Sequence, residues 1–145
     1  MAETLGMLCD KLTVVKLKQY HTNDQEKLAS LEKQASLLQS EINVYLTDAV
    51  HGRIPLELLT FESNKVFNVE GNKVTEISGN IAELVAKLAE VNCLVWHEQE
   101  KAYEFEKVPL EEKDNVVKNL AVLNLERNKC IDRINSLFKE MITKK

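Results

Sequence analysis

The sequence predicts an all-α protein, a four-helix bundle of two long antiparallel helical hairpins with an irregular insert between the second and third helices. Two observations predict this architecture. Over four long segments, apolar residues recur at steps of three and four, which is the spacing of one face of an α-helix. Glycine and proline, which interrupt helices, are scarce: 4 glycines and 2 prolines occur in 145 residues, and most of them lie between residues 52 and 79.

The composition is that of an ordinary globular domain. Hydrophobic residues make up 44% and charged residues 29% of a chain whose length suits one helical domain, residues 1–145. The net charge of -4 argues against a nucleic-acid partner, because nucleic-acid binders usually present a basic face. No apolar run is long enough to cross a bilayer, so we also expect no membrane association.

Three cysteines, Cys9, Cys93 and Cys130, form an odd set inside the expected helices. We expect them to be reduced thiols that pack as small hydrophobic residues in a cytoplasmic protein. The N-terminal residues include Glu3 and Asp10 and lack a basic segment followed by an apolar stretch, so no secretory signal is expected.

The first hairpin is predicted from two apolar stripes joined by a short polar break. The first helix should span about residues 4–20, and Asn23 or Asp24 should cap the second helix, which ends near Gly52. The two stripes are Leu5, Leu8, Leu12 and Val15, then Leu28, Leu31, Ala35, Leu38, Ile42 and Tyr45 at heptad spacing. The short break makes the two helices antiparallel neighbours.

Residues 53–79 form the irregular insert. Pro55 is expected to open a short helix over residues 56–59. Two short segments, 66–69 and 73–77, flank a turn-like sequence and could close a small β-hairpin, which would be marginal unless it packed on the bundle. A loop without regular structure is the alternative.

The second hairpin follows the insert. Ser78 or Asn80 should cap the third helix, which runs to about residue 107, and Pro109 should begin the fourth. The third stripe is Ile81, Leu84, Leu88, Val91, Val95, Glu98, Ala102 and Phe105, and the fourth is Val117, Leu120, Asn124, Arg127, Ile131, Ile134, Phe138 and Met141. Both stripes therefore contain polar residues.

These polar interruptions are the most informative feature of the sequence. Glu98, Asn124 and Arg127 stand where apolar residues are expected, and Asn92 precedes an apolar run that ends at Trp96. Burying such groups is unfavourable by several kcal/mol unless they find partners. They are therefore placed to meet one another or to meet a ligand.

The favoured interpretation is a set of structural pairs. In a hairpin that turns near residue 108, Glu98 lies level with Lys118, and Arg127 lies level with Glu90. Each charge then has an opposite charge within reach. Buried polar residues can fix the register of packed helices in this way.

A ligand site is the alternative. The planar guanidinium of arginine and the ammonium of lysine favour a phosphate or carboxylate, and Trp96 could stack on a base or a sugar ring. The candidate binding residues are Arg127, Asn124, Trp96, Glu98, Asn92, Lys11, Lys16 and Lys18. The ligand would be an anionic small molecule such as a nucleotide or a nucleotide sugar.

Signals for a metal or for catalysis are thin. Cys93 and His97 share a helical face, but no short Cys-x-x-Cys pair accompanies them, so neither a metal nor a cofactor is predicted. A magnesium-dependent all-α nucleotide pyrophosphohydrolase is a second alternative. The chain resembles such enzymes only in Glu111-Glu112-Lys113-Asp114, because their Glu-x-x-Glu half does not occur. No catalytic residue is assigned.

Three stretches of sequence carry a family resemblance: DKLTVVKLK at 10–18, VNCLVWHE at 91–98, and NLERNK at 124–129 with Ile131 and Asn135 after it. Together they resemble a small uncharacterised all-helical family of bacterial and phage proteins, whose bacterial members are often encoded near glycosyltransferase and surface-polysaccharide genes. The resemblance implies an all-helical domain, suits a phage origin, and brings no established activity, substrate or catalytic residue. The chain departs from the family in its longer insert, residues 53–79.

These observations predict a cytoplasmic, non-enzymatic helical binding or scaffold protein, in the host cytoplasm if a phage encodes it. A homodimer is expected, because apolar residues beside the main stripes make a wider band than one seam needs. These residues are Val14, Leu17, Val116, Leu123 and Leu137. A protein partner or an anionic small molecule would complete the binding function.

Overall fold

The structure, a computed structural model, describes residues 3–61 and 78–144. Its elements are α1 (Leu5–His21), α2 (Gln25–Val50), the 3₁₀ turn η1 (Leu56–Leu58), α3 (Ile81–Tyr103), the 3₁₀ turn η2 (Phe105–Lys107) and α4 (Leu110–Thr143). The described part of the chain contains no strand, which confirms the all-α prediction. The β-hairpin predicted from segments 66–69 and 73–77 lies outside the described residues.

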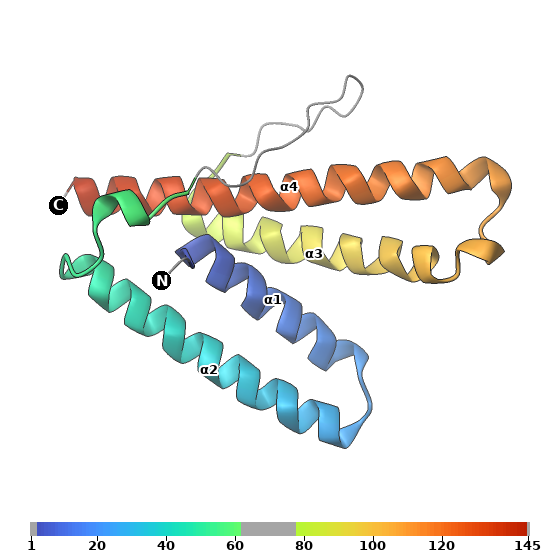
Figure 1. The fold of residues 1–145 in the computed structure, drawn as a ribbon, viewed down its shortest axis with the longest axis horizontal. Helices are drawn as coiled ribbons and strands as arrows, with labels where there is room; N and C mark the ends of the chain where they lie inside the picture. The colour runs from blue at the N-terminus through green and yellow to red at the C-terminus, as the bar shows by residue number, and fades with distance from the viewer. Residues whose placement is uncertain (1–2, 62–77, 145) are drawn as a thin grey trace.

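The helices form two antiparallel hairpins, α1–α2 and α3–α4, that meet in a V (Figure 1). Helix α1 lies between α2 and the α3–α4 hairpin and contacts all three other helices. At the closed end of the V, the start of α1 and the end of α2 lie against the start of α3 and the end of α4. The hairpins diverge toward the α1–α2 turn. None of the described helices is long and apolar enough to span a membrane.

Side-chain caps stand at the starts of α2 and α3, at residues that the sequence predicts as caps. The Asp24 side chain accepts hydrogen bonds from the first turn of α2, and Asn80 forms a capping box with Glu83 at the start of α3. Gly52, just after α2, has a φ of 73°, the left-handed conformation that glycine adopts without strain. The third helix is shorter than predicted, because α3 ends at Tyr103 and η2 follows.

The hydrophobic core fills the closed end of the V. Its buried residues are Leu5, Leu8, Tyr45, Ala49, Leu59, Leu84, Leu88, Cys130, Ile131, Ile134 and Phe138. The rings of Tyr45 and Phe138 lie 6.1 Å apart, so the end of α2 packs on the end of α4. Leu59 follows η1 and is only 1% exposed, so the first part of the insert packs into this core.

The stripe predicted for the fourth helix is correct from Ile131 to Phe138 and wrong toward both ends. Ile131, Ile134 and Phe138 are buried, but Val117 is 57% and Met141 61% exposed. Val116 is buried in place of Val117. The buried face of a helix depends on its neighbours, and among the described helices the first half of α4 lies beside α3, whereas α1 lies against its second half (Figure 1).

Gly6 lets α1 approach α4 closely. Its backbone N–H donates a buried hydrogen bond of 2.7 Å to Oδ1 of Asn135. A Cβ atom at this position would lie 2.5 Å from the carbonyl oxygen of Ile131 and 2.9 Å from Oδ1 of Asn135. Because the first of these neighbours is backbone, α1 and α4 would have to move apart to accept any larger side chain.

Replacing Gly6 by alanine should therefore destabilise the protein by about 2 kcal/mol, since the added methyl group overpacks the contact and lengthens the hydrogen bond to Asn135. Intrinsic helix propensity alone would give the opposite sign, a gain of up to about 1 kcal/mol. Urea unfolding of the Gly6→Ala variant decides between them. Equal or greater stability would show that α1 does not approach α4 this closely.

The Cys130 thiol gives the core a pH dependence of known sign. Burial raises the pKa of this thiol from 9.0 to about 11; the charge of Lys87 lowers the pKa to a smaller extent, and the charge of Glu126 raises it. Between these pH values the unfolded chain loses the thiol proton and the folded chain keeps it. The free energy of unfolding should therefore fall by about 2 kcal/mol as the pH rises through this range. In Cys130→Ala this part of the decline should vanish, and an unchanged pH profile would contradict the assignment.

Candidate functional site

Three helices meet at a buried polar network around Asp10. The Asp10 carboxylate accepts two hydrogen bonds from Arg127, from Nε at 2.8 Å to Oδ1 and from Nη2 at 2.5 Å to Oδ2. It accepts a third at 2.9 Å from Nδ2 of Asn92. Nδ2 of Asn92 also donates to the Thr13 hydroxyl at 2.8 Å. The network thus connects α1, α3 and α4 through direct contacts.

The network is closed on the α1 side and partly open on the α4 side. The Thr13 hydroxyl donates in turn to the Asp10 carbonyl oxygen at 2.8 Å. The Asp10 side chain is 9% exposed, whereas the Arg127 side chain is 31% exposed. Hydrogen bonding to Asp10 raises the pKa of the Arg127 guanidinium above its usual value. The Asp10 carboxylate is therefore held by three hydrogen bonds, two of which form a bidentate ion pair with Arg127.

Arg127 and Asn92, which the sequence singles out as polar residues in apolar surroundings, both belong to the network, but the predicted partner of Arg127 is wrong. Arg127 pairs with Asp10, while Glu90 lies near Lys87 at 3.8 Å on the surface of α3. The reason is topological, because α1 lies across the α3–α4 hairpin and supplies the carboxylate.

The other two interrupting residues do not join the network. Asn124 is exposed on α4, so its predicted place in a core stripe is wrong. Glu98 binds Lys101 on its own helix at 3.1 Å instead of the predicted Lys118, and its Oε2 atom is buried without a hydrogen-bond partner among the described residues. The predicted cluster is therefore split, with only Asn92 and Arg127 at its centre.

Asp10 is the residue that sequence reasoning missed. Its signal lies in a second face of the first helix, because Gly6, Asp10 and Thr13 are spaced by four and three residues and all face α3 and α4. One small residue and two polar residues at this spacing do not predict a buried helix face. Gly6 and Asp10 are buried and Thr13 is partly buried, because polar partners on the other hairpin bind them.

A groove opens beside the network, between α1 and α2. This Arg127 groove has a volume of about 430 Å³. It is lined by Lys11, Val14, Val15, Lys18, Gln34, Leu37, Leu38, Glu41 and Arg127. Lys11 also forms a salt bridge with Glu3. The groove therefore combines three basic side chains with four apolar ones and with the polar side chains of Gln34 and Glu41.

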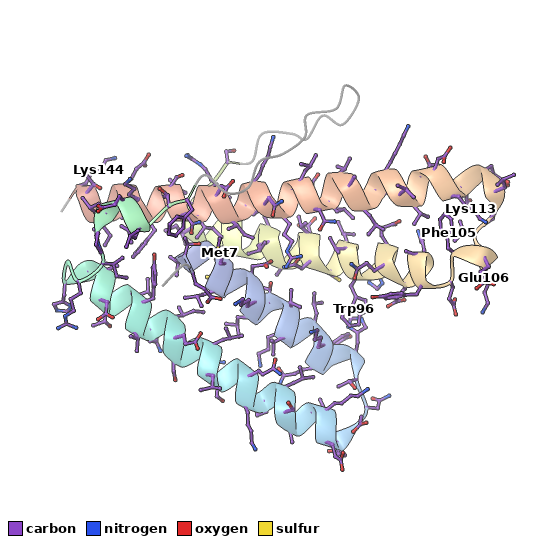
Figure 2. All side chains as sticks on the ribbon, viewed as in Figure 1. Met7, Trp96, Phe105, Glu106, Lys113 and Lys144 are labelled. Carbon is purple, nitrogen blue, oxygen red and sulfur yellow. The ribbon has the colours of Figure 1, made fainter. Side chains whose placement is uncertain are left out.

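A second groove lies at the open end of the V. This Trp96 groove has a volume of about 470 Å³ and is lined by Lys18, His21, Thr22, Lys27, Ser30, Leu31 and Trp96. The imidazole of His21 stacks on the indole of Trp96, with ring centroids 4.7 Å apart and planes at 24°. Figure 2 shows Trp96 projecting from α3 toward the end of α1.

The lysines predicted for the site are divided between the grooves. Lys11 lines the Arg127 groove and Lys18 lines both, whereas Lys16 is exposed and lines neither. Lys27 and His21 were not predicted. Their signal was weak, since both lie at helix ends beside the break between α1 and α2, where charged residues are common.

Metal-ligating side chains are dispersed over the described residues. No group of three or more histidine, cysteine, aspartate or glutamate side chains lies there in an arrangement that could hold a metal ion. Cys9, Cys93 and Cys130 are free thiols. Glu111 and Asp114 are exposed in the first turns of α4.

No protein-family model, curated protein or solved structure matches the chain. The family resemblance therefore stays a prediction, and geometry alone carries the functional assignment.

Arg127 and Asn124 lie one turn apart on α4 and form a matched pair of variants. Arg127→Ala leaves the Asp10 carboxylate buried with only Asn92 as a side-chain partner from the other hairpin, so it should lower the free energy of unfolding by about 3 kcal/mol. Asn124→Ala removes an exposed side chain and should change it by less than about 0.5 kcal/mol. Chemical denaturation of both variants measures the difference. Similar effects would mean that the network does not hold the fold.

Proposed function

We propose that the protein is a non-enzymatic helical binding or scaffold protein. The observation that carries this proposal is the network of Asp10, Asn92 and Arg127, in which polar side chains bind one another across three helices. Such a network holds helices in one arrangement, as a binding frame requires. A cytoplasmic location, expected from the unpaired cysteines, is part of the same proposal.

The two grooves support binding as the activity of this frame. Both volumes, about 430 and 470 Å³, fall in the range usual for small-molecule sites. Lys18 lines both grooves, and each has apolar side chains beside basic ones. An anionic ligand with an apolar or aromatic part suits the Trp96 groove best, because the Arg127 groove also contains the Glu41 carboxylate.

Binding of a nucleotide or a nucleotide sugar is the second candidate function. The observation that favours it is the stacked pair of His21 and Trp96 beside Lys18 and Lys27. Planar bases stack on aromatic side chains, and lysine binds phosphate as a point charge. This candidate is a more specific form of the binding proposal.

The expected homodimer stays a prediction. Within one chain, Val116 is already buried and Leu137 packs against the core, so these two residues do not form an exposed band. Other apolar side chains on the described surface are more exposed, including Leu37, Val44, Tyr103, Leu110 and Val117. A protein partner or a second copy would have to use such residues.

The pyrophosphohydrolase alternative also stays a prediction, and an assay of enzymatic activity distinguishes it from the binding proposal. It requires magnesium-dependent hydrolysis of nucleoside triphosphates that is lost in Glu111→Gln or Asp114→Asn. The binding proposal requires no turnover under the same conditions. Phosphate release from the purified protein measures this directly.

A thermal-shift screen tests the binding proposal. The probes are inorganic phosphate, dicarboxylates, nucleotides and nucleotide sugars. A ligand at a hundred times its dissociation constant stabilises the folded state by about 2.7 kcal/mol, which raises the melting temperature by several degrees. We expect one class to do so, and we expect the shift to shrink in Lys18→Ala but not in Lys16→Ala. A screen in which no probe stabilises the protein would contradict binding of a small anion and favour the scaffold form.

A further inference from the structure

The lining of the Trp96 groove is basic, although the chain as a whole has a net charge of -4. Among the described residues that line it, Lys18 and Lys27 carry charge and none is a carboxylate. Neither lysine forms a salt bridge with any described residue, whereas Lys11 and Lys101 do. The two ammonium groups are therefore free to bind an anion from solution.

Lys27 has no evident role within its own helix. It lies in the first turn of α2, where the helix dipole favours acidic side chains and disfavours a cation. Its backbone N–H donates a hydrogen bond to the Asp24 cap, and its side chain is exposed. Lys27 therefore adds positive charge to the groove, whereas the N-terminus of α2 is already capped by the Asp24 carboxylate.

Two aromatic rings are fixed at the wall of the same groove. His21 and Trp96 stack with a centroid distance of 4.7 Å. Nδ1 of His21 lies 2.9 Å from the carbonyl oxygen of Leu17, and because a carbonyl oxygen only accepts, this nitrogen carries the proton and donates. The imidazole is thus held by its own helix while it stacks on a residue of the other hairpin. A stacking surface formed before the ligand arrives reduces the entropy lost on binding.

The remaining lining completes a site for a molecule that is planar at one end and anionic at the other. Leu31 provides an apolar wall, and Thr22 and Ser30 provide hydroxyl groups. We propose that the Trp96 groove binds a mononucleotide unit, with the base stacked against the His21–Trp96 pair and the phosphate held by Lys18 and Lys27. This inference rests on the proposed binding function and defines its ligand class. Free nucleotides and nucleotide sugars share this chemistry.

The chain contains a single tryptophan, so tryptophan fluorescence reports on this groove alone. The full chain is titrated with AMP, UMP and UDP-glucose, with free tryptophanamide as the correction for absorption by the base. We expect saturable quenching by at least one of them. Adenosine lacks the phosphate and inorganic phosphate lacks the ring, so each should compete at least about tenfold more weakly than the matching nucleotide. Tighter binding of UDP-glucose than of UMP would identify nucleotide sugars as the source.

Two double variants provide the matched comparison. Lys18→Ala with Lys27→Ala removes both ammonium groups of the groove and should weaken binding about tenfold or more. Lys16→Ala with Lys33→Ala makes the same change in net charge on the same two helices, at exposed positions outside both grooves, and should leave binding within about twofold. All four lysines are exposed, so both variants should keep the parent melting temperature.

Three results would overturn the inference: no saturable quenching by any of the nucleotides, equal weakening in the two double variants, or inorganic phosphate that competes as well as AMP. The first result alone would not contradict the broader proposal that this is a binding protein. If another anion stabilises the protein in the thermal-shift screen and requires Lys18, the protein is still a binding protein, and only the nucleotide assignment fails.

Discussion

The carboxylate of Asp10 is buried on α1, and both side chains that neutralise or bind it from outside α1 belong to the other hairpin. Removing a carboxylate from water is unfavourable by several kcal/mol unless charge and hydrogen bonds replace the lost hydration. Arg127 on α4 and Asn92 on α3 supply that replacement at 2.5–2.9 Å. The carboxylate is therefore satisfied only when α1 lies across the α3–α4 hairpin, which makes this contact the condition for docking.

The network also divides the molecule into two regions of different character. Toward the closed end of the V, the hydrogen bond from Gly6 to Asn135 and the core around Ile134 hold the helices tightly together. Toward the open end, α1 leaves the α3–α4 hairpin, and the Arg127 and Trp96 grooves appear on either side of Lys18. Arg127 belongs to both regions, because it binds Asp10 and lines a groove. The shape of the grooves thus depends on the docking contact.

Helix number, most helix ends and the N-terminal caps follow from local sequence, since the apolar period and capping residues such as Asp24 and Asn80 act within a few residues. The spacing of apolar residues also identifies Arg127 and Asn92 as polar residues in apolar surroundings. Their partner Asp10 could not be predicted, because an apolar stripe shows which face of a helix is buried but not which helix covers that face. Asn124 continues the three-and-four spacing of the stripe but is exposed, because spacing along one helix does not show how far the neighbouring helices cover its face.

A double-mutant cycle on Asp10→Ala and Arg127→Ala tests the docking contact most directly. The free energy of unfolding is measured for the parent, both single variants and the double variant. If the two charges stabilise each other, the double variant should be less destabilised than the sum of the single variants, by about 2–3 kcal/mol. Additivity within about 0.5 kcal/mol would mean that the two side chains act independently, and the docking of the hairpins would then need another cause.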